Sequence, residues 1–425
     1  MRKLDVSIEL EGRMLEVGTI TGETDYSAQF EYTGDYLAQE SARPISLSLP
    51  LSDKPYGPEE TRRFFEGLLP EGFLRRTVAE NHRTDARDYL SILEMLGSEC
   101  LGAIQIKGEH YELTVPEYRP LDPEMMFRLA SEGATTSADL VVEAHLSLTG
   151  ASGKIGAYRN EEGKWFLPVG SAPSTHILKQ SHIRYDHIVQ NEQLAMQTAE
   201  LMGISIPASE IVETSGSPDE CVLFATERFD RTMEDSVRSI SGLPCPLRLH
   251  QEDFGQALGI ASSDKYEKPG DMHMKRMFEL LRRYSASPIE DQMRLWDIIV
   301  FHSLIGNTDG HIKNFALVYD RHLRSVRLAP AYDIISTVVY STHSSKMAFA
   351  IGGEIEWSKV GRRCFERACD EIRVSRNIFM KRYDRLEEAF VPALKQAAEH
   401  LTKNGYEESG ELAERLLAMK NVRSE

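Results

Sequence analysis

The feature that most constrains this chain is a polar nine-residue string, Gly306–Asn314, which follows a long apolar segment. It contains Asp309 and Asn314, which stand five positions apart, and a second acid, Asp333, follows farther along the chain. Between Asn314 and Asp333 lie two β-prone runs, Phe315–Tyr319 and Ser325–Leu328. Because a turn at residues 320–323 would pair these runs as a hairpin, we expect Asp333 to return beside Asn314.

An acid, an amide and a second acid in this arrangement can supply the groups that phosphoryl transfer from ATP requires. One carboxylate orients the attacking hydroxyl, and further oxygen ligands hold Mg²⁺ between the phosphates. The spacing from Asp309 to Asn314 is that of the catalytic loop in protein kinases, although His-Arg does not precede Asp309 and Ile-Ile follows Asp333 in place of Phe-Gly. The alternative is a tight Asp-Gly turn with two surface acids. The motifs below favour the first interpretation.

The composition of the chain limits the kinds of molecule to which it can bind. The 49 basic and 66 acidic residues leave a net charge of −17, which opposes a general affinity for nucleic acid or an anionic membrane. No apolar run approaches the length of a membrane span, and Asp5 and Glu9 stand where a signal peptide needs apolar residues. The five cysteines are scattered without Cys-x-x-Cys pairs, which predicts neither a disulfide framework nor a zinc site. We therefore expect a cytoplasmic protein without membrane association.

A glycine-rich segment, Leu146–Tyr158, is a candidate phosphate-binding loop between two strands. Its glycines at positions 150, 153 and 156 let the backbone approach an anion, and Lys154 adds a positive charge. It is not a Walker A sequence, because that pattern needs a longer gap between the first glycine and Gly-Lys, and a helix afterwards. A glycine-rich hairpin with no ligand explains this segment equally well when it is read alone.

A lysine and a glutamate form the next candidate pair. Residues 175–180 have the pattern of a strand that carries Lys179, and residues 187–202 have the pattern of a helix with Glu192 on its apolar face. A carboxylate on a buried face needs a partner, and a lysine on an adjacent strand can provide it. In kinases such a pair holds the ATP phosphates in register. Alternatively, Glu192 lies at the edge of the apolar stripe.

The rest of the chain predicts strands near the N-terminus and helices near the C-terminus. Residues 221–231 form an apolar strand that turns polar, which suits either a hinge near Glu227 and Phe229 or any strand end. His302, on an apolar helix face, is expected to pack in the core. Strands are expected in a meander over residues 1–35 and at 46–51. Helices are expected over residues 62–76, 89–96, 252–258, 272–284 and 288–304, with a C-terminal pair from about 375 to 420.

Together these motifs resemble the HipA family of serine/threonine kinases, the toxins of bacterial toxin–antitoxin pairs. The similar stretches are Phe64–Gly72, Ser147–Lys154, Lys179, Glu227–Asp230, Gly306–Asn314 and Tyr332–Asp333. The resemblance implies an α+β, two-lobed, protein-kinase-like fold with a β-rich N-terminal subdomain and a mostly helical C-terminal lobe. The implied divisions are residues 1–108 for the N-terminal subdomain, 109–228 for the lobe with the phosphate loop and 229–425 for the helical lobe.

The resemblance also implies roles for individual residues. Asp309 would accept the proton of the substrate hydroxyl, while Asn314 and Asp333 would hold Mg²⁺. The implied ATP contacts are Gly150, Ala151, Ser152, Gly153, Lys154 and Lys179 at the phosphates, and Glu227 and Phe229 at the adenine. The family's self-phosphorylated serine falls on Ser147. At Ser152-Gly153 this sequence departs from the family's usual residues.

The partners that the resemblance implies are a protein substrate and an antitoxin. Family members act on translation-related proteins such as aminoacyl-tRNA synthetases, and they bind DNA through a small helix-turn-helix antitoxin. A small-molecule phosphotransferase and a non-catalytic co-repressor scaffold are the alternatives. The scaffold is disfavoured, because a chain that has lost turnover would be expected to lack one of Lys179, Asp309, Asn314 and Asp333.

The net charge gives a first testable prediction. Because the chain carries −17 charges, we expect that it does not retard duplex DNA alone in a gel-shift assay at physiological salt. A basic protein partner should be required for any specific shift. Specific retardation by the isolated chain would contradict this prediction.

Overall fold

The first part of the chain is a four-stranded antiparallel sheet covered by short helices. The computed structural model describes residues 2–108, 114–132, 136–137, 140–141, 153–180, 185–214 and 221–423. The sheet has the order β3-β2-β1-β4, with β1 at Arg2–Leu10, β2 at Arg13–Gly22, β3 at Gln29–Tyr32 and β4 at Ile104–Gly108. The helices are α1 Gly34–Leu37, α2 Pro58–Phe65, η1 Glu66–Leu68, α3 Gly72–Asn81 and α4 Tyr89–Leu96. Alternate residues Leu4, Val6 and Ile8 are buried, so the predicted meander is confirmed.

Two details of this part differ from the prediction. Residues 46–51 form no strand beyond an isolated bridge between Ser46 and Leu49. The Ser46 hydroxyl and the Leu47 amide instead donate to the carboxylate of Glu252, at 2.5 and 3.0 Å. The helix expected over residues 62–76 is interrupted at Leu69, which is extended because it precedes a proline.

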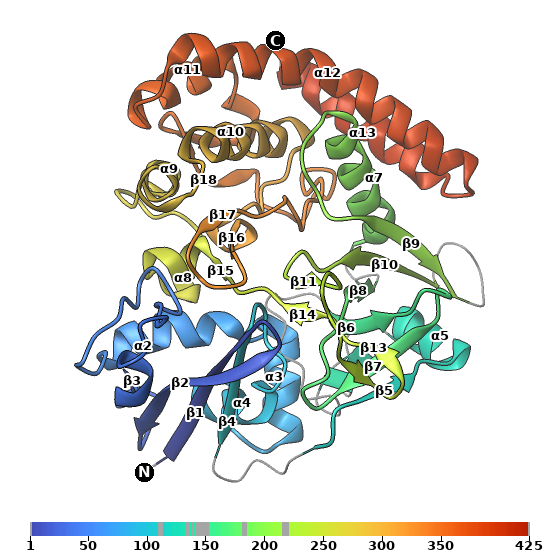
Figure 1. Cartoon of the computed structure of the whole chain (residues 1–425). Coiled ribbons are helices and arrows are strands. Elements are labelled where there is room, and N and C mark those ends of the chain that lie inside the picture. The colour runs from blue at the N-terminus through green and yellow to red at the C-terminus, as the bar shows by residue number, and fades with distance from the viewer. Residues whose placement is uncertain are drawn as a thin grey trace.

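The second part is a six-stranded sheet in which every neighbouring pair of strands is antiparallel. Its order is β5-β7-β6-β8-β10-β9, with β5 at Glu117–Pro120, β6 at Lys154–Arg159, β7 at Trp165–Val169, β8 at His176–Gln180, β9 at Ser209–Glu213 and β10 at Val222–Glu227. Helices α5 Pro123–Ser131 and α7 Ile188–Leu201 accompany it. Helix α7 packs on β9 and β10 and, on its other side, on the C-terminal helices. It therefore links this sheet to the helical part (Figure 1).

The last part is mostly helical. Its helices are α8 Phe254–Leu258, η2 Ser262–Asp264, α9 His273–Tyr284, α10 Pro288–Ile305, η3 Ile312–Asn314, η4 Trp357–Lys359, α11 Arg362–Glu371, α12 Arg376–Lys403 and α13 Glu408–Arg423. A three-stranded sheet contains β15 Gln251–Asp253, β16 Ala316–Tyr319 and β17 Val326–Leu328. Four two-residue strands, β11 Arg231–Thr232, β12 Ser239–Ile240, β13 Leu243–Pro244 and β14 Leu247–Arg248, precede it, and β18 Lys346–Ile351 pairs with β19 Glu354–Glu356.

The predicted hairpin after Asn314 is confirmed, because β16 and β17 pair antiparallel. Residues 252–253, expected in a helix, belong to strand β15, and helix α11 was not anticipated. Trp296 of α10 is fully buried between Phe365 of α11 and Phe379 of α12, with ring centroids 5.3 and 5.2 Å away. None of the described helices has the length and apolar character needed to cross a membrane.

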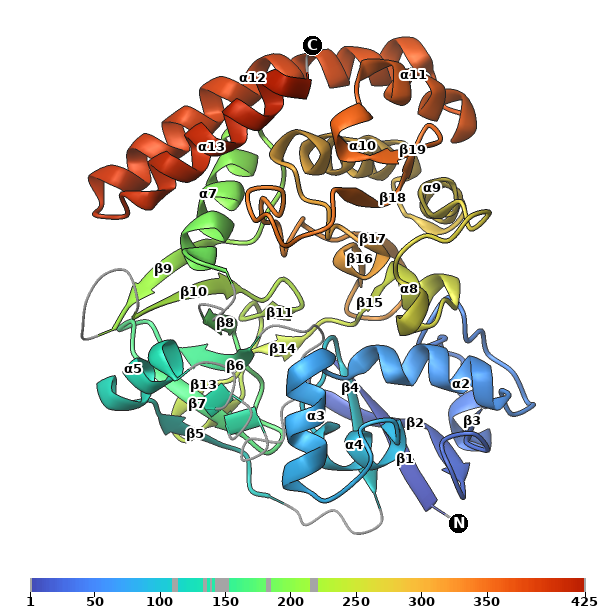
Figure 2. The ribbon, with the colours of Figure 1, turned by 180° about the vertical axis from the view of Figure 1, so that it is seen from behind.

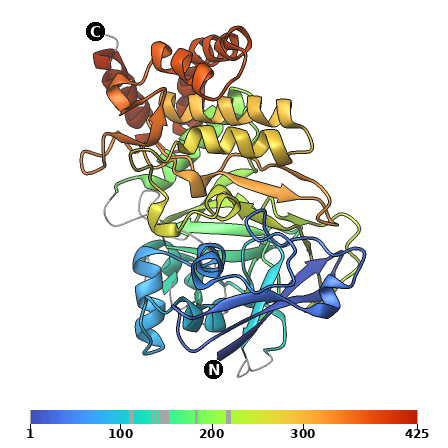
Figure 3. The same ribbon diagram turned by 90° about the vertical axis from the view of Figure 1, so that its left-hand side faces the viewer.

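The two larger sheets lie side by side below the helical part. Figure 1 shows the four-stranded sheet in blue, with β4 in teal, and the six-stranded sheet in teal and green. The gold and red helices lie above both sheets, and the view from behind in Figure 2 shows the same order. In the side view of Figure 3, the helices of the last part lie above the two larger sheets. Helix α2 of the N-terminal part packs on α8 of the helical part, and Glu99 accepts a hydrogen bond from the Ser174 amide, which lies just before β8.

A buried network of charges joins these parts. Its members are the carboxylates of Glu9, Glu99 and Asp230 and the guanidinium groups of Arg228, Arg231 and Arg248, all nearly inaccessible to solvent. Glu99 receives Arg231 at 2.7 Å and also binds Arg228 and Arg248. Burial alone would raise the pKa of Glu99, but Arg231, Arg248 and Arg228 together lower it to about 2. The three carboxylates and three guanidinium groups pair with one another, and this attraction offsets the free-energy cost of removing them from water.

Removing one carboxylate from this network should destabilise the fold. We expect Glu99→Ala to lower the free energy of unfolding by about 3–5 kcal/mol, because three buried guanidinium groups would lose a shared partner. Glu59→Ala, which removes the solvent-exposed partner of Arg63, is the control and should have a much smaller effect. Urea denaturation followed by circular dichroism would measure both. Equal losses in the two variants would show that the buried network does not stabilise the junction.

Candidate active site

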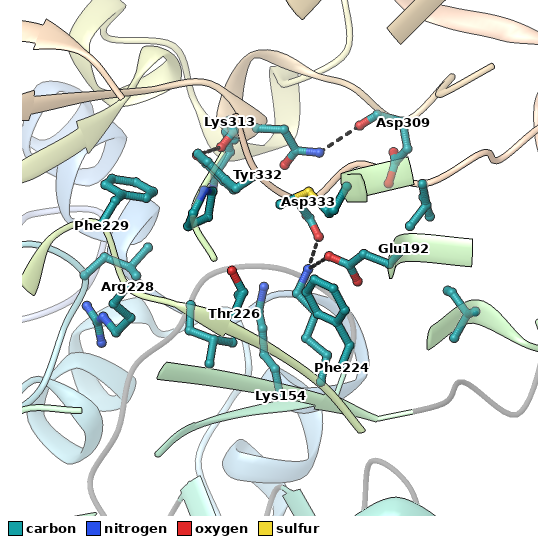
Figure 4. Close-up of a pocket in the computed structure, with 18 of the residues that line it drawn as sticks. Lys154, Glu192, Phe224, Thr226, Arg228, Phe229, Asp309, Lys313, Tyr332 and Asp333 are labelled. Atoms are coloured by element: carbon teal, nitrogen blue, oxygen red, sulfur yellow. Dashed lines mark hydrogen bonds and ion pairs between the residues drawn. The ribbon is translucent and has the colours of Figure 1, made fainter. Parts of the chain in front are cut away.

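A cavity of about 340 Å³ lies between the six-stranded sheet and the helical part. Strands β6, β8 and β10 and helix α7 line it from one side, and the segments that follow α10 and β17 line it from the other. Figure 4 shows labelled side chains of both groups, including Lys154, Glu192, Asp309 and Asp333, around one space. The predicted site residues that line it are Lys154, Lys179, Glu192, Glu227, Phe229, Asp309, Asn314 and Asp333. A concave site with a few convergent charged groups is the usual form of a ligand pocket.

The end of helix α10 shapes the loop that carries Asp309. Gly306 terminates the helix in the left-handed conformation, with φ of 71°, and a Cβ atom there would lie 2.3 Å from Val338 Cγ2, so only glycine fits. Within the loop, the Asp309 amide donates to Asn307 Oδ1 at 3.0 Å, and the Asn314 side-chain amide donates to the Asp309 carbonyl oxygen at 3.0 Å. Asn314 therefore fixes the loop backbone through its nitrogen and keeps its side-chain oxygen for another ligand.

His302 of helix α10 packs against this loop, as predicted for a core residue. It is 3% exposed and stacks on Phe315 with ring centroids 5.4 Å apart. A Cβ atom at position 310 would lie 2.1 Å from His302 Nδ1, so the glycine after Asp309 is required by this packing. Burial lowers the pKa of His302 to about 4, and the ring is neutral at physiological pH.

Lysine 179 connects the two sides of the cavity. Its Nζ lies 2.5 Å from Glu192 Oε1, which confirms the ion pair predicted between the strand and the helix. The same ammonium group also binds the Asp333 carboxylate from the opposite side, as the dashed lines in Figure 4 mark. Burial disfavours the charged lysine, but Asp333 and Glu192 raise its pKa above the ordinary value. Burial of Glu192 outweighs the attraction of Lys179, so the pKa of this carboxyl group is also raised.

Aspartate 333 follows the β16–β17 hairpin in an uncommon backbone conformation. Its φ is 57°, in the left-handed region, which aspartate tolerates better than most residues. Burial would raise its pKa, but Lys179 and Lys154 hold the pKa well below the ordinary value. The side chain is thus a carboxylate at physiological pH. Its oxygens and the side-chain oxygen of Asn314 fit Mg²⁺, which usually takes one or two protein oxygen ligands together with substrate phosphates. Within the described ranges no group of three or more His, Cys, Asp or Glu side chains forms a metal site.

Lys154 differs from the other lysines of the cavity because, among the described residues, it forms no ion pair. It begins strand β6, and its Cα is the register partner of Lys179 on β8, so the two lysines are neighbours in the sheet. Among the described residues Lys154 has no carboxylate within 4.0 Å of its Nζ, although its side chain is almost fully buried. Burial lowers its pKa to about 8, against a smaller opposing effect of Asp333. The prediction placed Lys154 in a loop, whereas the structure places it at the start of a strand.

The remaining predicted residues are only partly described. Ser147, Gly150, Ala151 and Ser152 lie outside the described residues, and the carbonyl oxygen of Gly153 accepts the Gln180 amide at 3.4 Å. At the predicted hinge, the Glu227 amide donates to the Ala208 carbonyl oxygen at 2.9 Å. The ring of Phe229 lies 5.5 Å from that of Tyr332 and forms an aromatic wall of the cavity.

Four residues at this site were missed by the sequence analysis. Glu71, from the N-terminal part, receives Lys313 Nζ at 2.6 Å and Lys265 Nζ at 2.7 Å. Burial opposes ionisation of Glu71, but Lys313 and Lys265 lower its pKa to about 2. Thr226 lines the cavity with a buried hydroxyl that has no partner among the described residues, and it offers a hydrogen bond to a ligand. Lys313 belongs to the string Gly306–Asn314 and Glu71 to the stretch Phe64–Gly72, so both had a sequence signal, whereas Lys265 and Thr226 had none.

The phenol of Tyr266 donates a hydrogen bond to Asp309 Oδ1. Burial of Asp309 raises its pKa above the ordinary value, and the hydrogen bond from Tyr266 partly opposes this. Asp309, which the sequence analysis predicted to accept the substrate proton, therefore already contacts a hydroxyl group of its own chain.

Comparison with known proteins now identifies the family. Residues 146–394 match the model of the HipA-like C-terminal domain, and residues 9–107 match that of the HipA N-terminal domain. A putative kinase of Sinorhizobium fredii, Y4mE, is 32% identical over 396 residues, covering 92% of this chain and 90% of that protein. The serine/threonine-protein kinase toxin HipA of Shewanella oneidensis is 26% identical, over 84% of this chain and 80% of that protein.

The fold agrees with this family. The chain superposes with a TM-score of 0.78 on a solved structure titled as the Shewanella oneidensis complex of HipA, HipB and its operator DNA, at 22% identity and covering 99% of both chains. The predicted fold class is thus confirmed: strands dominate the N-terminal part and helices the C-terminal region of a kinase-like structure. The chain belongs to the HipA-like family, as its motifs predicted.

The two cavity lysines should differ sharply in their effect on stability. We expect Lys179→Met to lower the free energy of unfolding by roughly 3 kcal/mol, because Glu192 and Asp333 would lose their shared cation. The estimate is at the low end of the usual range because the Asp333 side chain is 36% exposed. Lys154→Met is the matched control and should leave stability unchanged or increase it, since it removes an unpaired buried charge. Chemical denaturation measures both, and a larger loss for Lys154→Met would refute this assignment of charges.

Proposed function

We propose that this chain is an ATP-dependent serine/threonine protein kinase of the HipA type. The observation that carries the proposal is the double ion pair of Lys179, which joins Glu192 of one side of the cavity to Asp333 of the other. Asp309 and Asn314, five positions apart, lie on the same rim as Asp333. A kinase needs these groups together because phosphoryl transfer depends on positioning and electrostatic stabilisation of the phosphates.

In this proposal each side chain has a role that its contacts allow. Lys179 and Lys154, adjacent on two strands, bind phosphate oxygens, and Lys154 is free to do so because it has no described ion pair. Asn314 and Asp333 would hold Mg²⁺, which would supply positive charge to the phosphates. Asp333 would then contact both the metal and Lys179. Asp309 orients the acceptor hydroxyl and accepts its proton.

The adenine end of the cavity is proposed to lie along the hinge. The Phe229 and Tyr332 rings provide an apolar wall, and the unpaired Thr226 hydroxyl and backbone groups near Glu227 and Phe229 provide polar contacts. We also propose that residues 150–154 cover the phosphates and that Ser147 is a self-modified residue. By the family resemblance, a phosphate at Ser147 would limit further turnover, because its about −1.5 to −2 charges oppose return of the loop to bound phosphates.

The partners are proposed from the family. The relative in the solved complex is assembled with HipB and operator DNA. We propose that this chain likewise binds a small helix-turn-helix antitoxin and reaches DNA only through it. A translation-related protein, such as an aminoacyl-tRNA synthetase, is the proposed substrate. The proposed divisions remain residues 1–108, 109–228 and 229–425, and the end of β4 at Gly108 supports the first boundary.

Two aspartate variants should fail for different reasons. We expect Asp309→Asn to reduce phosphate transfer by roughly 10²- to 10⁴-fold while Mg·ATP still binds, because only proton acceptance and hydroxyl orientation are lost. Asp333→Asn should abolish both transfer and tight Mg·ATP binding, because a metal ligand is removed. Radiolabelled ATP transfer and isothermal titration calorimetry measure the two effects.

The control for these variants is Asp370→Asn, on the exposed surface of α11, which should retain transfer and binding. Mass spectrometry of a bacterial lysate incubated with the chain and Mg·ATP distinguishes phosphorylated proteins from phosphorylated small molecules. Full turnover in Asp309→Asn would overturn the proposed function.

A further inference from the structure

We propose that Tyr266 is a phosphate acceptor of this chain's own active site. The inference rests on the proposed kinase function and adds a modification site to it. Tyr266 lies in the segment between η2 and α9, and its phenol donates to Asp309 Oδ1. This is the hydrogen bond that an acceptor hydroxyl must make with the catalytic carboxylate. A tyrosine hydroxyl thus occupies the position that a substrate hydroxyl would take.

The ring of Tyr266 is held against the catalytic loop by its surroundings. It meets the His311 ring edge-on, with centroids 5.3 Å apart and planes at 87°, and Lys265 Nζ lies 5.5 Å from its centroid. His311 belongs to the same loop as Asp309. The contact between the phenol and Asp309 is therefore part of a packed arrangement and does not depend on one hydrogen bond.

The backbone on both sides of Tyr266 is also fixed. Before it, Lys265 forms its ion pair with Glu71. After it, the Glu267 amide donates to the Ala348 carbonyl oxygen at 2.9 Å, and the Glu267 carboxylate accepts the amides of His273 and Ala350, each at 2.6 Å. Because these contacts already hold the segment, little conformational entropy is lost when the Tyr266 side chain is placed beside Asp309. This favours an intramolecular reaction.

Donor and acceptor can reach Asp309 without competing for space. Asp309 lines the cavity in which ATP is proposed to bind, whereas Tyr266 is not among the lining residues. Tyr266 is 45% exposed, so the modified ring can turn toward solvent when the reaction is complete. The geometry thus combines a phosphate donor inside the cavity with an acceptor hydroxyl at its edge.

The chemistry is that of the proposed reaction. The Tyr266 Oη attacks the γ-phosphorus of ATP and forms a new oxygen–phosphorus bond, while the bond from that phosphorus to the β,γ-bridging oxygen breaks. ADP leaves with the bridging oxygen, and the phenolic proton passes to Asp309. Burial and the neighbouring Asp309 raise the pKa of Tyr266, so the phenol keeps its proton until attack. The product carries about −1.5 to −2 charges beside Asp309, and repulsion would move the modified ring away from the carboxylate.

The test is incubation of the full chain with Mg·ATP, followed by peptide mass spectrometry. We expect phosphate on Tyr266 and none on Tyr26, which is more exposed, at 73% against 45%, but packs against Arg62 in the N-terminal part. Because donor and acceptor share one chain, the fraction modified per unit time should not change over a tenfold range of protein concentration. In a mixture with the unmodified wild-type chain, an isotope-labelled Asp309→Asn chain should remain without phosphate on Tyr266.

The outcomes separate the two proposals. If Asp309-dependent phosphate transfer occurs on another acceptor while Tyr266 stays unmodified, the inference about Tyr266 is overturned and the kinase proposal survives. Labelling of Tyr266 in the Asp309→Asn chain by the wild-type chain would overturn the intramolecular geometry. If no acceptor gains phosphate and ATP is not consumed in an Asp309-dependent manner, the proposed function itself fails.

Discussion

The ammonium group of Lys179 is the contact on which the site depends. It belongs to the six-stranded sheet, yet its two carboxylate partners come from helix α7 and from the segment after β17. A buried lysine needs such partners, because the charged form is costly in a region of low polarity. Its two ion pairs therefore fix how the sheet, the helix and the C-terminal part are placed around the cavity. The same contact leaves Asp333 ionised at the cavity, as its proposed role of metal ligand requires.

The buried charges of the junction are paired, whereas one buried charge of the cavity has no ion pair among the described residues. In the junction formed by Glu9, Glu99, Asp230 and the three arginines, every buried charge has partners of opposite sign, including those of Arg228 and Asp230, which also line the cavity. In the cavity, Lys154 is buried without an ion pair among the described residues. An unpaired charge lowers stability, and proteins retain such groups where a ligand supplies the partner. This contrast supports assigning the cavity, and not the junction, to ligand binding.

Local patterns predicted several elements correctly because their signals are contained in short stretches. The alternation of residues 4–8 gave strand β1, the apolar face around Glu192 gave helix α7, and the β-prone runs after Asn314 gave the β16–β17 hairpin. Errors arose where a distant partner overrode the local pattern. Ser46 and Leu47 bind Glu252, about two hundred positions away, in place of a neighbouring strand.

The sequence by itself determined the family, the spacing of Asp309 and Asn314, and the pairing of Lys179 with Glu192, because each depends on residue type and on periodicity within one segment. Only the tertiary structure decided that Asp333 is the second partner of Lys179, that Glu71 reaches Lys313, and that Tyr266 contacts Asp309. These contacts join residues between 43 and 242 positions apart. Such contacts depend on how whole elements pack against one another, and no local pattern of residues encodes that packing.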